Sequence, residues 1–274
     1  MTPPTAPPDI AQIKSGMKAT WMAGDFGQIA NFIAPEAEQF ITRLRLKPGM
    51  KVLDVACGTG NTAIPAAKAG AKVIGVDIAT NLLEQARTRA ASAKLDIEFK
   101  EGDAEDLPCA DRSFDVVVTM FGAMFAPRPD RVAAELLRVC KPGGLIAMAN
   151  WTPQGFGSRT FEITAKMVPP PPGVPQPNLW GEESVVRQRL GHGCSEITCT
   201  PRKIQMAYPF PPKEMVAFFR TYFGPTKVAF SKLDAVGQES LAAQLETVWV
   251  EQNTATDGTT AIEGEYLDVR AIRA

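Results

Sequence analysis

Two consecutive runs of the chain decide its fold. Residues 51–67 read KVLDVACGTGNTAIPAA, and residues 72–87 read KVIGVDIATNLLEQAR. In the first run, an apolar segment carrying Asp54 precedes a turn with Gly58 and Gly60, whose missing side chains let backbone amides approach a ligand closely. The pattern predicts a strand, a glycine-rich turn, a helix and a second strand that ends in an acid. Such a unit is typical of adenosine-cofactor sites.

The residues around the turn distinguish two kinds of adenosine ligand. A nicotinamide dinucleotide site places a G-x-G-x-x-G turn and a helix N-terminus against a pyrophosphate. Here residues 56–63 read ACGTGNTA and follow Asp54. A carboxylate at that place repels phosphates but attracts the ammonium and sulfonium of S-adenosylmethionine. We therefore expect S-adenosylmethionine as the cofactor and S-adenosylhomocysteine as its product.

Length and composition favour one enlarged α/β domain or two domains, acting on a small molecule. The 274 residues carry a net charge of −1, so there is no electrostatic footprint for nucleic acid. The cysteines are odd in number and show no C-x-x-C spacing, so we expect neither a disulfide framework nor a metal site, and a reducing cytoplasm. They are Cys57, Cys109, Cys140, Cys194 and Cys199.

The N-terminal stretch MTPPTAPPD lacks the features of a secretory signal. We expect it to be a frayed, proline-rich tail, and no apolar run is long enough to span a membrane. Helical apolar spacing then continues to residue 46, with a restart at Pro35. The segment 20–27 contains Trp21, which is either a lid over the cofactor or a core anchor.

Strands and helices alternate through the middle of the chain, which predicts a parallel sheet with its strand C-termini along one ligand-binding edge. The expected strands are 51–55, 72–77, 96–100, 114–120 and 145–150, with helices from about residues 62 and 81 and over 131–140. We expect three regions: a tail and helical lid (1–46), a cofactor-binding core (47–152), and cap helices with the remaining core strands (153–274).

The last third of the chain is less regular. Residues 168–177 are too rich in proline for a helix or a central strand and predict a stiff extended loop. The further expected elements are a helix at 182–190, a strand at 195–208 broken by Pro201, helices over 215–250 interrupted at Gly224-Pro225 and at Gly237, and a final strand at 265–272.

Five blocks in order carry a family resemblance: DVACGTG, VDIATNLLEQAR, EGDAEDLP, SFDVVVTMFGAMF and ELLRVCKPGGLIAMAN. Over residues 47–152 the chain resembles the class I S-adenosylmethionine-dependent methyltransferases, especially the branch with the ubiquinone/menaquinone C-methyltransferases. The resemblance implies an α/β fold with a doubly wound, seven-stranded Rossmann-like sheet of order 3-2-1-4-5-7-6. The last strand of this sheet is antiparallel. N-terminal helices precede the sheet in the chain, and a helical cap is inserted after the sixth strand.

The resemblance also implies roles for individual residues. Asp54 and the turn are expected to bind the methionine half of the cofactor. Asp77 is expected to accept hydrogen bonds from the ribose hydroxyls, and Asp103 from the adenine amino group. Asp77 as a helix N-cap and Asp103 as a turn residue are the alternatives. The full expected cofactor set is Trp21, Asp54, Ala56, Gly58, Thr59, Gly60, Asp77, Ile78, Leu82, Asp103, Ala104, Thr119 and Phe121.

Methyl transfer from a sulfonium is an in-line displacement, for which alignment and exclusion of water suffice. We therefore assign no catalytic residue. The only histidine, His192, is expected in a turn away from the reaction edge. The expected acceptor is small and apolar or aromatic. The wall of its binding pocket is expected to include Met124, Trp151, Arg159, Phe219 and Tyr222. Arg159 and Arg220 are candidate anchors for an acidic group of the acceptor.

The acceptor itself, the methylated element and the oligomeric state stay open. A sensor that binds S-adenosylmethionine without turning it over, or a nicotinamide-dependent oxidoreductase, remains an alternative function.

Overall fold

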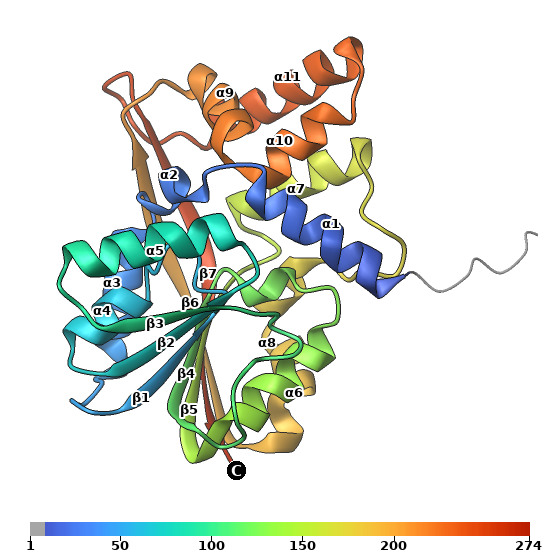
Figure 1. Ribbon diagram of the computed structural model, residues 1–274. Helices are drawn as coiled ribbons and strands as arrows, with labels where there is room; N and C mark the ends of the chain where they lie inside the picture. Colours follow the sequence, from blue (N-terminus) through green and yellow to red (C-terminus); the bar gives the residue numbers. More distant parts are fainter. Residues whose placement is uncertain (1–8) are drawn as a thin grey trace, which may run out of the picture.

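A seven-stranded sheet forms the centre of the computed structural model, which describes residues 9–274 (Figure 1). The strand order is β3-β2-β1-β4-β5-β7-β6, which confirms the expected topology. The strands are β1 (Lys51–Val55), β2 (Lys72–Asp77), β3 (Ile97–Glu101), β4 (Phe114–Met120), β5 (Cys140–Trp151), β6 (Cys194–Tyr208) and β7 (Thr260–Arg273). The first five run parallel, and β7 is antiparallel to both of its neighbours. The expected proline-rich tail lies mostly outside the described residues.

The central strands are buried on both faces because helices cover both sides of the sheet (Figure 1). In β1 every residue from Val52 to Val55 is buried, as expected for a parallel strand that reads as a continuous apolar run. The helices beside the sheet are α3 (Ala34–Leu44), α4 (Ala63–Lys68), α5 (Thr80–Ser92), α6 (Pro129–Val139) and α8 (Glu183–Leu190).

A second group of helices lies beyond the carboxyl ends of the parallel strands, at the top of Figure 1. They come from three separate parts of the chain. They are α1 (Ile10–Met22), α2 (Phe26–Ala30), α7 (Phe156–Met167), α9 (Pro212–Tyr222), α10 (Gly224–Ser231) and α11 (Ala235–Gln252). Within residues 9–274 no helix combines the length and apolarity needed to cross a membrane.

Two expected breaks are wrong. Strand β6 continues through Pro201, which pairs in register with Leu267 of β7. Proline is tolerated there because β6 is the edge strand and one side of its backbone has no partner strand. Gly237 does not interrupt α11 either: it lies in the first turn, where its N–H donates to the capping Asp234 side chain at 2.8 Å.

Helix α7 was not anticipated, and β7 begins at Thr260 rather than at residue 265 because its first residues pair with the end of β6.

Candidate functional site

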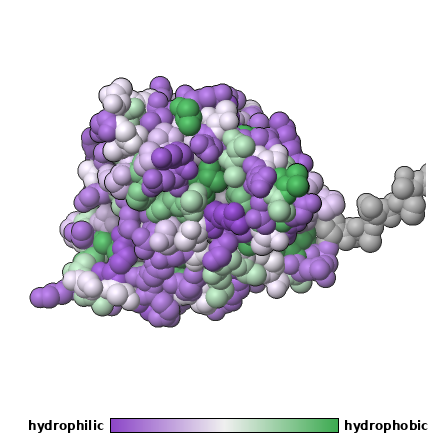
Figure 2. Space-filling model, turned by 90° about the horizontal axis from the view of Figure 1, so that it is seen from above, coloured by the Kyte–Doolittle hydropathy of each residue, from purple (hydrophilic) through white to green (hydrophobic). Residues whose placement is uncertain are grey.

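A cavity with about 1080 Å³ of empty space opens at the carboxyl edge of the sheet. Seen from above, apolar residues lie between polar residues on the outer surface of the molecule (Figure 2). The cavity gathers most of the expected cofactor residues from β1, β2, the loop after β3 and the loop after β4. Of the expected set it is lined by Trp21, Ala56, Gly58, Thr59, Asp77, Ile78, Leu82, Asp103, Ala104 and Phe121.

The turn after β1 has an unusual backbone. Ala56, Gly58 and Gly60 all have positive φ, at 56°, 52° and 82°. This conformation favours glycine and strains alanine slightly. Directly opposite, a Cβ added at Gly122 would lie 2.6 Å from the Ala56 Cβ, so the turns after β1 and β4 touch. The close contact fixes the floor of the cavity.

Asp77 ties this turn to the end of β2. Its Oδ2 accepts the Gly58 N–H at 2.8 Å, and its Oδ1 accepts the Ala79 N–H at 2.8 Å. Burial raises the pKa of Asp77, against the lowering effect of these backbone donors. The residue is not the N-cap of α5, a position that Ala79 occupies. Each carboxylate oxygen keeps acceptor capacity for a ligand, because a carboxylate offers about four lone-pair sites.

Asp54 lies behind the turn and does not line the cavity. Its side chain is fully buried, and Oδ2 accepts the Thr62 hydroxyl at 2.5 Å, just before α4 begins. Burial raises the pKa of Asp54 to about 7. Its Oδ1 has no hydrogen-bond partner of good geometry in the described part of the chain. Gly60 and Thr119 likewise support the cavity without lining it, and Thr119 Oγ accepts the Ala123 N–H at 3.2 Å.

Asp103 faces helix α1 across the mouth of the cavity. Lys14 Nζ lies 2.5 Å from Asp103 Oδ2 and 2.6 Å from Glu105 Oε2. The other Asp103 oxygen accepts the Glu105 N–H at 2.9 Å, so Asp103 is a turn residue and a cavity residue at once. Lys18 pairs with Glu101 beside it. These ion pairs hold α1 over the cavity.

A second cavity, with about 1000 Å³ of empty space, adjoins the first. The two share one wall, made of Trp21, Phe26, Ile33, Phe121 and Phe125. Trp21 meets Phe26, Phe125 and Phe223 edge-on at centroid distances of 5.7, 5.1 and 5.8 Å. Trp21 therefore packs among aromatic rings and also lines both cavities.

The second cavity carries no lysine, arginine, histidine, aspartate or glutamate among its lining residues. Of the expected acceptor residues, Trp151 and Phe219 line it. The structure does not bring the other three to it. Met124 is a core residue with 2% exposure, Arg159 pairs with Glu251 at 2.8 Å, and Tyr222 lies outside the lining. Arg220 donates to Gln238 instead, at 2.7 Å.

Several lining residues of this second cavity were missed, notably Met206 and Tyr208 of β6 and Trp249 of α11. A sequence signal existed for the strand: Ile204, Met206 and Tyr208 are apolar at every second position and are buried on one face. No sequence pattern indicated Trp249, because its contact with β6 depends on how α11 packs in the folded protein. His192 lies in the turn Gly191–Gly193 between α8 and β6, and it lines neither cavity.

Comparisons with known proteins agree with this geometry. A family model described as a methyltransferase domain matches residues 52–144. An uncharacterised protein of Mycobacterium tuberculosis is 37% identical over 257 residues, which cover 91% of each chain. The demethylmenaquinone methyltransferase of Renibacterium salmoninarum is 43% identical over 110 residues, 40% of this chain and 45% of that protein. The fold resembles that of YcgJ from Bacillus subtilis, with a TM-score of 0.57, 17% identity and coverage of 86% and 97%.

Proposed function

Because the chain belongs to the class I S-adenosylmethionine-dependent methyltransferases, we propose that it transfers the methyl group of S-adenosylmethionine to a small apolar or aromatic acceptor. One observation carries the proposal. A cavity with a buried carboxylate at one end shares an aromatic wall with an adjoining cavity that has no charged lining residue. The first suits a cofactor with a ribose and a charged tail, and the second suits an apolar molecule.

The residues of the first cavity fit S-adenosylmethionine. Asp77 is 7% exposed, and both of its oxygens keep acceptor sites beyond their backbone partners, which suits a ribose diol. Ile78, Leu82 and Ala104 offer apolar cover for a purine ring. The turn around Gly58 would hold the methionine half, with the carboxylate of Asp54 behind it.

The proposed chemistry needs little from side chains. The bound cofactor supplies an electrophilic methyl group on a sulfonium. Phe121 and Phe125, which line both cavities, then align the acceptor for in-line attack, and Trp21 excludes water from above. No general base is assigned, and His192 plays no part in this arrangement.

Calorimetry with S-adenosylmethionine, S-adenosylhomocysteine and NAD tests the cofactor. We expect binding of both adenosyl ligands and none of NAD. Binding of NAD without a response to either adenosyl ligand would overturn the proposal in favour of an oxidoreductase.

A screen of neutral aromatic hydroxyl, amine and quinol compounds, read out as S-adenosylhomocysteine formation, tests turnover. We expect product with at least one class. Cofactor binding with no turnover across the screen, beyond the slow background breakdown seen without acceptor, would favour a sensor.

A further inference from the structure

The acceptor cavity described above is lined by one deeply buried tyrosine, Tyr208, whose hydroxyl lacks a strong partner. Tyr208, on β6, is 2% exposed. The nearest partner of its hydroxyl is Met206 Sδ, at 3.8 Å. A thioether is a weak acceptor, so the phenol keeps nearly all of its capacity to donate and to accept. A buried polar group left in this state costs free energy, which a ligand can recover.

The other polar groups of this cavity are less suited to hold a ligand. Thr160 and Thr164 donate their hydroxyl protons to main-chain carbonyls of α7, at 2.7 and 2.8 Å. Thr226 is half-buried rather than enclosed. Trp21, Trp151 and Trp249 also line the cavity, but an indole N–H can only donate. Among the lining side chains, Tyr208 therefore alone combines deep burial with a hydroxyl that can both donate and accept.

Neighbouring rings fix the direction of the Tyr208 side chain. Its ring lies 4.3 Å from that of Phe32 and 5.7 Å from that of Trp249, between centroids. The rings of Phe218 and Phe219 lie 6.3 and 6.2 Å from it. A phenol held in this way is pre-organised, so a hydrogen bond to a ligand costs little further side-chain entropy.

Burial raises the pKa of Tyr208, so the group is a neutral phenol at physiological pH and does not act as a tyrosinate base. It can donate to an oxygen or nitrogen atom of a ligand. A carboxylate or a phosphate would be held poorly, because the cavity offers no positive charge to replace its hydration.

We propose that the Tyr208 hydroxyl is the polar anchor of the acceptor, which is an uncharged ring compound bearing a hydroxyl or carbonyl oxygen. This inference rests on the proposed methyltransferase function. Tyr208 lines only the acceptor cavity, whereas Trp21, Phe121 and Phe125 line the wall shared with the cofactor. The anchored oxygen therefore lies away from the sulfonium, and the methyl group goes to a different position of the ring compound.

A binding experiment with matched probes tests the anchor without knowledge of the natural acceptor. The probes are toluene, p-cresol and p-toluate, and naphthalene, 2-naphthol and 2-naphthoate, each titrated into the protein saturated with S-adenosylhomocysteine. Saturation-transfer NMR and calorimetry report binding. In the probe set that fits the cavity better, we expect the phenol to bind at least about fivefold more tightly than the hydrocarbon of the same ring size. The carboxylate of that set should bind more weakly than both.

The Tyr208→Phe variant removes only the hydroxyl. We expect it to abolish the preference for phenol over hydrocarbon while leaving affinity for S-adenosylhomocysteine unchanged. Tyr222→Phe is the matched control, because Tyr222 packs against Phe218 at 5.0 Å outside the cavity lining. Thr226→Val tests the remaining half-buried hydroxyl. Both controls should keep the preference, and denaturant unfolding checks that all three variants fold.

The outcomes are distinguishable. Persistence of the phenol preference in Tyr208→Phe, its loss in Thr226→Val, or failure of both phenols to bind would overturn this inference and leave the methyltransferase proposal standing. Failure of S-adenosylhomocysteine to bind the wild-type protein would instead overturn the proposed function on which the inference rests.

Discussion

The ring of Phe121 lies flat on the indole of Trp151, with centroids 3.8 Å apart and planes 5° from parallel. Phe121 has φ of 58°, a left-handed conformation that costs a bulky residue about 1 kcal/mol or more. The stack on Trp151, together with an edge-on contact to Tyr266 at 5.5 Å, offsets that strain. Phe121 also lines both cavities.

We predict that Phe121→Ala and Trp151→Ala have different effects on cofactor affinity and on the affinity for acceptor probes. Trp151 lines only the acceptor cavity, whereas Phe121 lines both. Trp151→Ala should weaken binding of 2-naphthol or p-cresol about tenfold or more and leave S-adenosylhomocysteine affinity within about twofold. Phe121→Ala should weaken both. Calorimetry measures each affinity, and Trp151→Phe, which keeps a stacked ring, should retain most of the binding. Equal loss of cofactor affinity in the two alanine variants would contradict the shared-wall arrangement.

Asp77→Ala tests the ribose assignment. We expect cofactor affinity to fall by about 1.5 to 3 kcal/mol, the range for hydrogen bonds to a charged acceptor. The carboxylate also accepts the Gly58 N–H, so Asp77→Asn, which keeps one acceptor oxygen, should lose less. Asp106→Ala is the control, because it removes the same charge from an exposed position on a neighbouring loop. Unchanged affinity in Asp77→Ala would mean that the carboxylate only supports the turn.

Helix α1 should open readily. None of its residues is fully buried, and the pairs of Lys14 with Asp103 and Glu105 hold it at the cavity mouth. We predict faster amide hydrogen exchange in residues 10–22 than in the central strands, and slower exchange there once S-adenosylhomocysteine binds. Lys14→Ala should speed exchange about three- to tenfold in the free protein. Lys232→Ala, an exposed lysine, serves as the control. If S-adenosylhomocysteine leaves the exchange rate of α1 unchanged, α1 does not cover the bound cofactor.

The parallel strands and the glycine turn could be predicted because their signals are local, whereas the sheet order came from the family resemblance. A run such as Val52–Val55, a glycine turn and an acid at the end of β2 lie within 30 residues. Pro201 was misjudged because tolerance for proline depends on an edge position, which is a property of the whole sheet. The pairing of Lys14 with Asp103 joins residues 89 positions apart, and no periodicity reveals it.

The acceptor wall was harder to predict for the same reason. Phe219 and Trp151 line the second cavity, and they were candidates because aromatic residues follow strands at the reaction edge. Arg159 was a candidate anchor for an acid, and its pairing with Glu251 of α11 could not be predicted because Glu251 lies far along the chain. Tyr208 was missed because its place depends on how β6 meets α9 and α11.

Asp54 should make the stability of the free protein depend on pH. Its pKa is about 7 when folded, owing to burial, against about 4 in an unfolded chain. Between these values the folded protein holds a proton that the unfolded chain has released. Stability therefore falls as pH rises from about 4 to about 7, by at most ~1.4 kcal/mol per pH unit.

Asp54→Asn keeps an acceptor for the Thr62 hydroxyl and removes the titration. We expect the free energy of unfolding of this variant, measured by denaturant titration from pH 5 to pH 8, to vary less with pH than that of the wild type. The same slope in both proteins would assign the effect to other groups.

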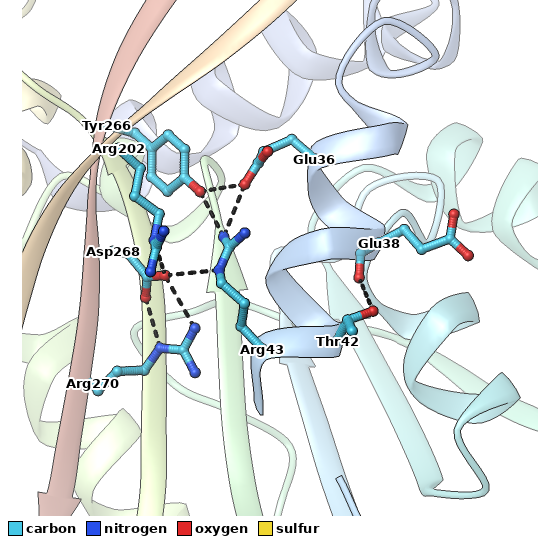
Figure 3. Close-up of polar contacts among 8 residues, drawn as sticks. All are labelled: Glu36, Glu38, Thr42, Arg43, Arg202, Tyr266, Asp268 and Arg270. Atoms are coloured by element: carbon cyan, nitrogen blue, oxygen red, sulfur yellow. Dashed lines mark hydrogen bonds and ion pairs between the residues drawn. The ribbon is translucent and has the colours of Figure 1, made fainter. Parts of the chain in front are cut away.

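An ionic cluster joins α3, β6 and β7 (Figure 3), and its Tyr266 ring packs edge-on against Phe121 of the aromatic stack. The Tyr266 hydroxyl donates to Glu36 Oε1 at 2.5 Å and accepts from Arg43 Nη2 at 2.7 Å. Asp268, whose side chain is 2% exposed, pairs with three arginines at 3.4, 2.9 and 2.7 Å. They are Arg43, Arg202 and Arg270. Burial alone would raise the pKa of Asp268, but the hydrogen bonds and charges of these arginines outweigh it and lower the pKa.

We predict that Asp268→Asn destabilises the protein by about 3 kcal/mol near pH 7, the lower end of the range for a broken buried pair, because the three arginines that lose their counter-charge are only partly buried. A carboxylate with a lowered pKa contributes stability above its unfolded pKa of about 4 and loses it as the pH falls further. The difference between Asp268→Asn and the wild type should therefore shrink toward pH 3. Tyr266→Phe, which keeps the ring against Phe121 and the pair of Glu36 with Arg43, should cost only about 1 to 3 kcal/mol. Denaturant unfolding at pH 7 and pH 3 measures both variants, and a pH-independent cost for Asp268→Asn would show that its effect comes from packing rather than charge.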